Sequence, residues 1–145
     1  MRAFKGPGDV KILSVSPLEE DHAALRAIAG QFAWELFQAD GLPAALGFLT
    51  QQDVSVVICE HDLAPGMWTD LLERIIDLPH PPSLVVTSRL ADEQLWAEAL
   101  NRGAWDVLAK PFDRTEVLRV VSAAWQHWHG RIHLPIALKV MKVAS

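Results

Sequence analysis

Short apolar runs alternate along the chain with longer stretches in which apolar residues recur every three or four positions. Most of the short runs are rich in Val, Ile and Leu, which is typical of strands buried on both faces of a sheet. The longer stretches are typical of helices with one buried face. We therefore predict five strands, at residues 10–15, 34–39, 54–59, 84–87 and 106–109. We predict five helices, at residues 17–30, 43–51, 68–78, 91–102 and 113–128.

Strands and helices alternate throughout, and the connections between them are short. This order predicts an α/β fold, a three-layer sandwich in which right-handed crossovers place helices on both faces of a parallel sheet. The length of 145 residues suits one domain. We expect the domain to span residues 10–129, after a flexible leader at residues 1–9. Residues 130–145 alternate apolar and polar residues in part, and we expect a tail that adds a strand, contacts a partner or is disordered.

The first helix carries a start signal. Ser16 can act as its N-cap, with Pro17 as the first helical residue and Glu19 as the reciprocal partner of a capping box. Glu20 and Asp21 add negative charge to the first turn, which suits the helix dipole. We therefore expect the helix to start at Ser16, and its acidic residues to have a structural role.

Two later helices carry a similar signal, one at its carboxyl end and the other at its amino end. Gly103 follows the helix at residues 91–102 and is expected to be its C′ residue. Asp113 is expected to cap the last helix.

A cluster of charge follows the most apolar of the predicted strands. Glu60, His61 and Asp62 come directly after residues 54–59. In a parallel α/β sheet, ligands and chemistry lie at the carboxyl ends of the strands. The three residues could form an acid–base or metal cluster, although neighbouring loop residues point in different directions, and an ordinary solvated loop is the alternative.

Composition excludes several classes of function. The net charge of −5 argues against a direct contact with nucleic acid, because there is no basic field to attract phosphates. Cys59 is the only cysteine, so there is no disulfide framework and no zinc-binding spacing, which fits a reducing cytoplasm. No apolar run reaches the roughly 18 residues of a membrane helix, and no signal peptide is evident. We expect a cytoplasmic protein without a membrane partner.

Two stretches in the second half of the chain resemble response-regulator receiver domains, the CheY-like family. Residues 85–88, Val-Val-Thr-Ser, resemble the end of that family's fourth strand. Residues 103–112, Gly-Ala-Trp-Asp-Val-Leu-Ala-Lys-Pro-Phe, resemble its fifth strand and the Lys-Pro-Phe turn. The resemblance covers about residues 11–128. It implies a flavodoxin-like (βα)5 fold with strand order 2-1-3-4-5 and a role in two-component phosphorelay signalling rather than in enzymatic catalysis.

The family's chemistry implies roles for particular residues. In that family an Asp after the third strand accepts a phosphoryl group, and two acidic residues after the first strand help it to hold Mg²⁺. A Thr or Ser and a Lys then bind the phosphoryl oxygens. Thr87 and Lys110 match these two groups, and the Lys110–Pro111 peptide bond is expected to be cis. Glu60 falls on the acceptor position.

Three positions depart from the family's pattern. The acidic pair falls on Ser16 and Pro17, neither of which supplies a carboxylate, so we predict a degraded Mg²⁺ site and no cofactor. Val107 falls on the position of the aromatic switch residue. A shorter alignment would place the acceptor on His61 instead of Glu60.

Several alternatives remain open. One is a conventional phospho-receiver that uses Glu60 or Asp62. Another is a metal site rebuilt from Glu19, Glu20 and Asp21. A third is a flavodoxin-like ligand-binding protein, although the anionic loop after the first strand would repel a flavin phosphate.

The interpretation that we favour is a stand-alone, atypical receiver that acts by protein–protein contact. Its partners would be a histidine kinase, a downstream effector or a second copy bound through the last helix–strand–helix face. Trp96 is our candidate for a partner contact. His127 and His129 lie two residues apart, so they occupy different helix faces and do not form a metal site.

Overall fold

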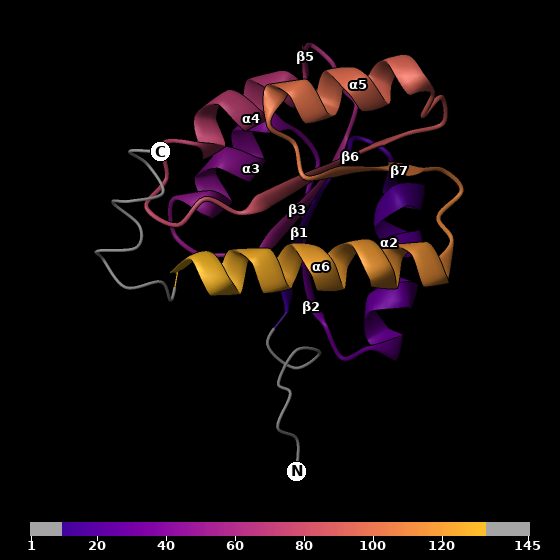
Figure 1. The fold of residues 1–145 in the computed structure, drawn as a ribbon, viewed down its shortest axis with the longest axis horizontal. Helices are drawn as coiled ribbons and strands as arrows, with labels where there is room; N and C mark the ends of the chain where they lie inside the picture. Colours follow the sequence, from indigo (N-terminus) through magenta and orange to yellow (C-terminus); the bar gives the residue numbers. More distant parts are fainter. Residues whose placement is uncertain (1–9, 133–145) are drawn as a thin grey trace.

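The computed structural model describes residues 10–132, which form a parallel sheet between two helical layers (Figure 1). The sheet has five strands in the order β2-β1-β3-β6-β7, and every neighbouring pair is parallel. Counted along the chain, these strands follow the predicted order 2-1-3-4-5. Their bounds are β1 (Lys11–Val15), β2 (Glu35–Ala39), β3 (Val56–Glu60), β6 (Ser83–Ser88) and β7 (Asp106–Ala109).

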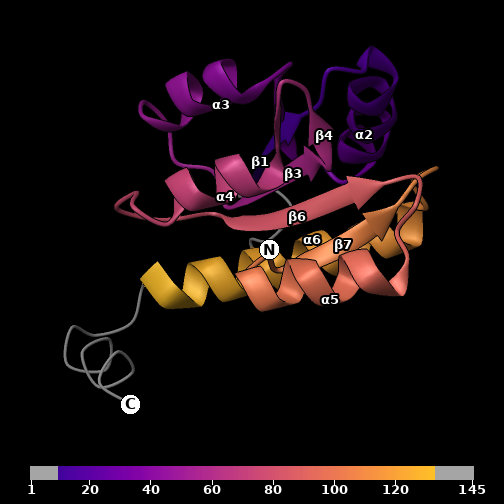
Figure 2. The same cartoon turned by 90° about the horizontal axis from the view of Figure 1, so that it is seen from above.

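The helices divide between the two faces of the sheet, and this confirms the predicted three-layer α/β sandwich. Buried side chains of α3, α4 and α5 form one core with the sheet, and those of α2 and α6 form another. Figure 1 shows α5 and α6 on opposite sides of β6 and β7, and Figure 2 shows these two strands side by side and running in the same direction. The bounds are α2 (Glu19–Gln31), α3 (Leu42–Leu49), α4 (Trp68–Ile75), α5 (Glu93–Arg102) and α6 (Arg114–Ile132).

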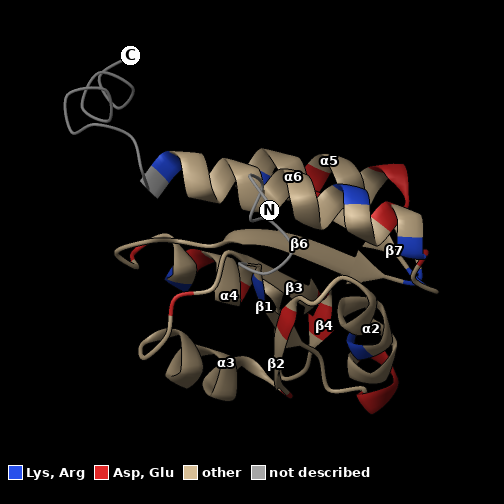
Figure 3. Cartoon of the chain, turned by 90° about the horizontal axis from the view of Figure 1, so that it is seen from below, with Lys and Arg blue, Asp and Glu red and all other residues tan. Residues whose placement is uncertain are grey.

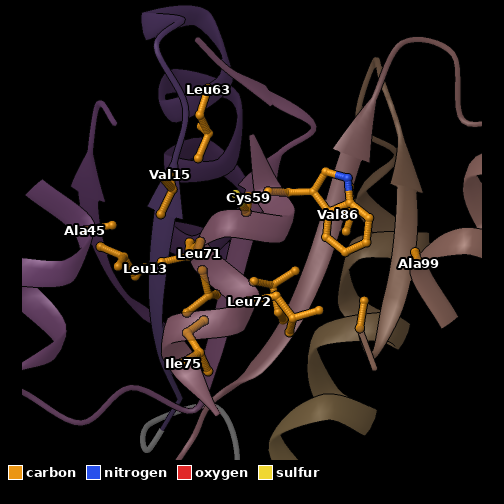
Figure 4. Close-up of a cluster of buried hydrophobic side chains, with 14 of the residues drawn as sticks. Leu13, Val15, Ala45, Cys59, Leu63, Leu71, Leu72, Ile75, Val86 and Ala99 are labelled. Carbon is orange, nitrogen blue, oxygen red and sulfur yellow. The ribbon is translucent and has the colours of Figure 1, made fainter. Parts of the chain in front are cut away.

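Strand β3 is buried on both faces, as its apolar run predicts. Val57 and Cys59 belong to the core beneath α4, whereas Val56 and Ile58 belong to the core beneath α6. Figure 4 shows Cys59 and Val86 of the sheet beside side chains of α4. A strand fixed on both faces holds the residue at its carboxyl end, Glu60, in a defined place.

The predicted start of the first helix is wrong. Helix α2 begins at Glu19 after Leu18, and no side chain caps it. The Ser16 N–H still donates to the Ala39 carbonyl at 3.1 Å, so Ser16 continues the pairing with β2 and cannot be the N-cap. Its hydroxyl accepts from the Leu18 N–H at 3.0 Å and donates to the Asp21 carboxylate at 2.6 Å.

Other helix ends agree with the sequence more closely. Gly103 ends α5 in the left-handed conformation, with φ 106°. The Asp113 carboxylate accepts from the Glu116 N–H at 2.9 Å, as expected of a cap. Helix α6, however, runs to Ile132 rather than to residue 128, and Arg131 donates to the Pro81 carbonyl from this additional turn. The predicted leader at residues 1–9 and residues 133–145 of the predicted tail lie outside the described residues.

A short hairpin, which the sequence analysis did not predict, follows β3. It pairs β4 (Asp62–Leu63) with β5 (Gly66–Met67) in antiparallel fashion. The Asp62 carboxylate accepts from the Ala64 N–H at 3.0 Å within this turn.

Two properties of the exterior bear on the classes of partner. Figure 3 shows acidic and basic residues interspersed on α2, α5 and α6. Within residues 10–132, none of the helices has the length and apolarity to cross a bilayer.

Candidate functional site

Polar side chains from three strand ends and one helix meet at the carboxyl edge of the sheet. Glu60 ends β3, and its register partner on β6 is Thr87. Lys110 directly follows β7, and Asp21 lies in the first turn of α2. The structure thus brings together Glu60, Thr87 and Lys110, which the sequence singled out, and adds Asp21.

The Lys110 ammonium lies between two carboxylates. Its Nζ is 2.7 Å from Glu60 Oε1. The same nitrogen donates to Asp21 Oδ2 at 3.0 Å and to Asp21 Oδ1 at 3.1 Å. The side chains of Lys110, Asp21 and Glu60 are only 6%, 7% and 12% exposed. The cluster is therefore a buried ionic triad rather than a surface pair.

Two hydroxyl groups complete the hydrogen bonding of the carboxylates. Thr87 Oγ1 donates to Glu60 Oε1 at 3.2 Å, the oxygen that also faces Lys110. Ser16 Oγ donates to Asp21 Oδ2 at 2.6 Å. A carboxylate can accept several hydrogen bonds, so these contacts satisfy buried acceptors and orient them toward the ammonium.

A buried histidine fixes the loop that carries Ser16. His22 Nε2 lies 2.9 Å from the Ser16 carbonyl oxygen, and His22 Nδ1 lies 2.9 Å from Ser14 Oγ. These contacts join α2 to β1 and to the residue that directly follows it. The first turn of α2, which carries Asp21, is thus fixed against the end of β1.

Electrostatics keep Lys110 charged in spite of its burial. Desolvation alone would lower the pKa of the Lys110 ammonium. Hydrogen bonds and charge attraction from Glu60 and Asp21 act in the opposite direction, and together they raise this pKa above its usual value. Lys110 thus contributes a positive charge to a cluster that contains two carboxyl groups.

The other acidic residues near the start of α2 face outward. Glu19 pairs with Arg26, and Glu20 pairs with Arg89, both at 3.0 Å and both on the surface. Of the three acids considered for a rebuilt metal site, Asp21 is the one that binds Lys110. Within residues 10–132, no group of three or more His, Cys, Asp or Glu side chains has the arrangement of a metal site.

The neighbours of Glu60 have other contacts. The His61 N–H donates to the Thr87 carbonyl at 2.8 Å, and the His61 carbonyl accepts from the Trp68 N–H at 3.2 Å. The Asp62 side chain is occupied in the β4–β5 turn. The side-chain contacts with Thr87 and Lys110 are made by the Glu60 carboxylate.

The remaining positions named from the sequence have varied surroundings. Pro17 is exposed, and the Lys110–Pro111 bond is cis. Val107 is buried within β7. Burial also raises the pKa of the Cys59 thiol, which stays protonated at neutral pH and is no nucleophile.

The histidines near the end of α6 stack on different tryptophans. His127 stacks on Trp105, and His129 stacks on Trp125, each with ring centroids 4.7 Å apart. The two imidazoles therefore lie against different neighbours.

Asp21 is the site residue whose contact with Lys110 the sequence analysis did not predict. The sequence offers Asp21, like Glu19 and Glu20, only as a helix-dipole charge or as one acid of a rebuilt metal site. The available signal was spacing, because Asp21, Leu25 and Ile28 recur at helical intervals and all three are buried. A carboxylate on a buried helix face requires a cationic or hydrogen-bonding partner.

Comparison with known proteins places this geometry in a family. The model of the response regulator receiver domain matches residues 18–122. The chain belongs to this family. Receiver domains are signalling modules of two-component systems, and they work through other proteins such as kinases and effectors. No curated protein matches the chain in a sequence search.

Solved receiver structures share the fold over most of the chain. The signal receiver domain of an HD domain-containing protein from Pseudomonas fluorescens Pf-5 is 26% identical with a TM-score of 0.78, over 92% of this chain and 98% of that one. The chemotaxis response regulator CheY4 of Vibrio cholerae is 14% identical with a TM-score of 0.72, over 79% and 98% of the two chains. The beryllofluoride-activated NtrC4 receiver domain, a dimer, is 19% identical with a TM-score of 0.75, over 81% and 98%.

Proposed function

We propose that this receiver is an atypical signalling module whose site holds a permanent negative charge in place of a transient phosphoryl group. The observation that carries this proposal is the pair of contacts on one oxygen, Glu60 Oε1. Lys110 lies 2.7 Å from it, and the Thr87 hydroxyl donates to it at 3.2 Å. In the family, the matching Thr or Ser and Lys bind phosphoryl oxygens. Here both groups already bind an internal anion.

The surroundings of Glu60 support a site that works without Mg²⁺. Ser16 and Pro17 stand where the family has two metal-binding acids, and neither carries a carboxylate. Mg²⁺ requires a near-octahedral set of oxygen ligands. The two carboxylates at the site, Asp21 and Glu60, both bind the Lys110 ammonium. These residues do not fit the magnesium site of a conventional receiver, so we assign no cofactor to the chain.

The length of the Glu60 side chain also disfavours phosphoryl transfer. Relative to Asp, the additional methylene moves the carboxylate about 1.5 Å farther from the backbone, and a misplacement near 1 Å can cost about 10²-fold in rate. The same added length lets the Glu60 carboxylate reach Lys110 and Thr87 directly. We therefore assign Glu60 a structural and signalling role rather than that of a phospho-acceptor.

We propose that the module acts in the cytoplasm by protein–protein contact through the face formed by α5, β7 and α6. Trp96 and Leu100 on α5 are 42% and 44% exposed, and Leu90 in the preceding loop is 79% exposed. Exposed aromatic and aliphatic side chains of this kind are enriched at protein interfaces. The partner would be a kinase, a downstream effector or a second copy of the chain, and neither nucleic acid nor a membrane is expected to bind.

The test is intact-mass spectrometry after incubation of the chain with acetyl phosphate and Mg²⁺. The proposal predicts no added phosphoryl group, because the Glu60 carboxylate is already bound by Lys110 and Thr87 and lacks a metal to recruit the donor. A conventional receiver treated in parallel serves as the control for donor activity. Stoichiometric phosphorylation of Glu60 or Asp62 would overturn the proposal and identify a conventional phospho-receiver.

A further inference from the structure

We infer that Lys110 is the resident cation of a two-carboxylate site formed by Asp21 and Glu60, and that its ammonium keeps divalent cations out. This inference rests on the proposed function and deepens it, because it names what replaces the metal and which helix residue makes the replacement possible. Asp21 is then a positioning residue, which holds Lys110 from α2 while Glu60 holds it from β3.

The contacts describe a cation site. Both oxygens of Asp21 lie within 3.1 Å of Lys110 Nζ, and Glu60 Oε1 lies 2.7 Å from the same nitrogen. Two carboxylates that share one ammonium at these distances are close enough for a single Mn²⁺ or Ca²⁺ ion to bind both. All three side chains are almost fully buried.

The neighbouring hydroxyls supply further oxygen ligands. Ser16 Oγ is 2.6 Å from Asp21 Oδ2, and Thr87 Oγ1 is 3.2 Å from Glu60 Oε1. A hydroxyl rotates freely and offers two lone pairs as well as a proton, so each can turn from a carboxylate to a cation. The set of two carboxylates and two hydroxyls consists entirely of hard oxygen donors, which suit Mg²⁺, Ca²⁺ and Mn²⁺.

The ammonium has a decisive advantage over a free ion. It is tethered to the end of β7, so its effective concentration at the carboxylates is set by the chain rather than by the solution. A free ion must displace it and leave a cationic Lys110 in a buried place, which is costly. The site in the natural chain should therefore not bind Mg²⁺ at cellular concentrations.

Removal of the ammonium should expose the hidden site. In Lys110→Met, two buried carboxylates face each other without a counter-charge, and either a proton or a cation must relieve their repulsion. We expect Lys110→Met to bind one Mn²⁺ with a dissociation constant on the order of 10⁻⁴ to 10⁻³ M, in the range of weak carboxylate sites.

The experiment is a Mn²⁺ titration of the full chain at pH 7.5, followed by electron paramagnetic resonance, on four proteins. Lys110→Met should bind one ion, whereas the natural chain and Lys11→Met, a matched loss of an exposed lysine, should show no saturable binding. The double variant Asp21→Asn with Lys110→Met should bind at least tenfold more weakly than Lys110→Met. Equal binding by the natural chain and Lys110→Met, or no binding by Lys110→Met, would overturn the inference.

A thermal measurement covers the case in which Lys110→Met is only marginally folded. A ligand that binds only the folded state raises the melting temperature. Mn²⁺ should raise that of Lys110→Met and leave that of the double variant unchanged, and equal shifts in both would contradict the inference. These outcomes are independent of the phosphorylation test, which uses the natural chain.

Discussion

The positive charge of Lys110 can be buried because two carboxylates bind it, and two hydroxyls in turn donate hydrogen bonds to those carboxylates. Taking an ion pair out of water is costly, so such groups add little net stability compared with apolar residues of the same shape. Removal of one partner of such a pair does lower the free energy of unfolding, because it leaves a buried charge without its full set of opposite charges. The triad is therefore better understood as a device that fixes one arrangement of the strand ends than as a source of stability.

At the scale of single residues, Asp21→Asn should weaken the fold measurably. The change keeps the shape of the side chain but removes a charge-assisted contact with Lys110, a class of hydrogen bond worth about 1.5–3 kcal/mol. We expect urea unfolding to show a loss of this size. Glu19→Gln, two residues earlier in the same turn but on the surface, is the matched control and should change stability by less than about 0.5 kcal/mol. Equal effects in the two variants would contradict the buried role of Asp21.

Glu60→Asp should not by itself create a phospho-receiver. The substitution restores the residue type of the family's acceptor but leaves Ser16 and Pro17 without carboxylates. It also shortens the reach toward Lys110, so we expect lower stability and no labelling by acetyl phosphate with Mg²⁺ in a mass measurement. Robust labelling of this variant would show that the missing acidic pair is dispensable.

Lys110 should also give the chain a stability that disappears only at high pH. Because its pKa in the folded state is raised above the ordinary value of 10.5, the contribution is fully present below that value. It is lost as the pH rises through the higher folded-state pKa. Unfolding free energies of the natural chain and Lys110→Met should differ by a constant amount from pH 7 to about pH 10 and converge above it. Convergence already between pH 7 and pH 9 would contradict a raised pKa.

The contacts of individual side chains were also harder to predict from the sequence than the helices and strands. Glu60 could be named because it directly follows an apolar strand of a predicted parallel sheet, whereas Thr87 and Lys110 could be named from the resemblance to receiver domains. Asp21 could not be assigned in the same way, because an acid in the first turn of a helix has a sufficient local explanation. Its contact with Lys110 joins residues far apart in the chain and depends on how α2 packs on the sheet.

At the scale of elements, the alternation of apolar runs and helical periodicity identified every strand of the main sheet and every helix. The start of α2 differs from the predicted one because the Ser16 backbone N–H donates to the Ala39 carbonyl. Ser16 is therefore part of the strand pairing and is not available to cap the helix. The end of α6 differed because Arg131 finds a tertiary partner in the loop before β6. Both differences come from contacts between elements, which local patterns do not contain.

The end of α5 offers a test of local backbone preference. Gly103 has φ 106°, and a Cβ added there would meet nothing within 4 Å, so Gly103→Ala should cost about 1 kcal/mol through the left-handed conformation alone. Gly30 lies inside α2, where an added Cβ is also free of contacts. Gly30→Ala should therefore stabilise the chain by about 0.5 kcal/mol. Chemical denaturation of the two variants measures both, and equal signs would contradict this account of the helix end.

At the scale of the whole molecule, the receiver fold places the ends of β1, β3, β6 and β7 around one polar site. In the family a phosphoryl group makes this edge a switch, which biases a surface between two states. Here an internal carboxylate, Glu60, binds Thr87 and Lys110, which match the family's phosphate-binding pair, and a second carboxylate, Asp21 of α2, also binds the lysine. We propose that this arrangement is permanent.

A tryptophan beside the site makes that claim directly measurable. The backbone N–H of Trp68 donates to the backbone carbonyl of His61, the residue after Glu60. The Trp68 side chain is fully buried. A rearrangement around Glu60 should therefore alter the fluorescence of the chain.

The most direct measurement is a titration of the natural chain with beryllofluoride, a phosphoryl mimic, in the presence of Mg²⁺, followed by tryptophan fluorescence. A fixed site predicts an unchanged spectrum at all concentrations, while a conventional receiver in the same buffer responds. A saturable response that requires both beryllofluoride and Mg²⁺ would contradict the account and show that the switch still operates.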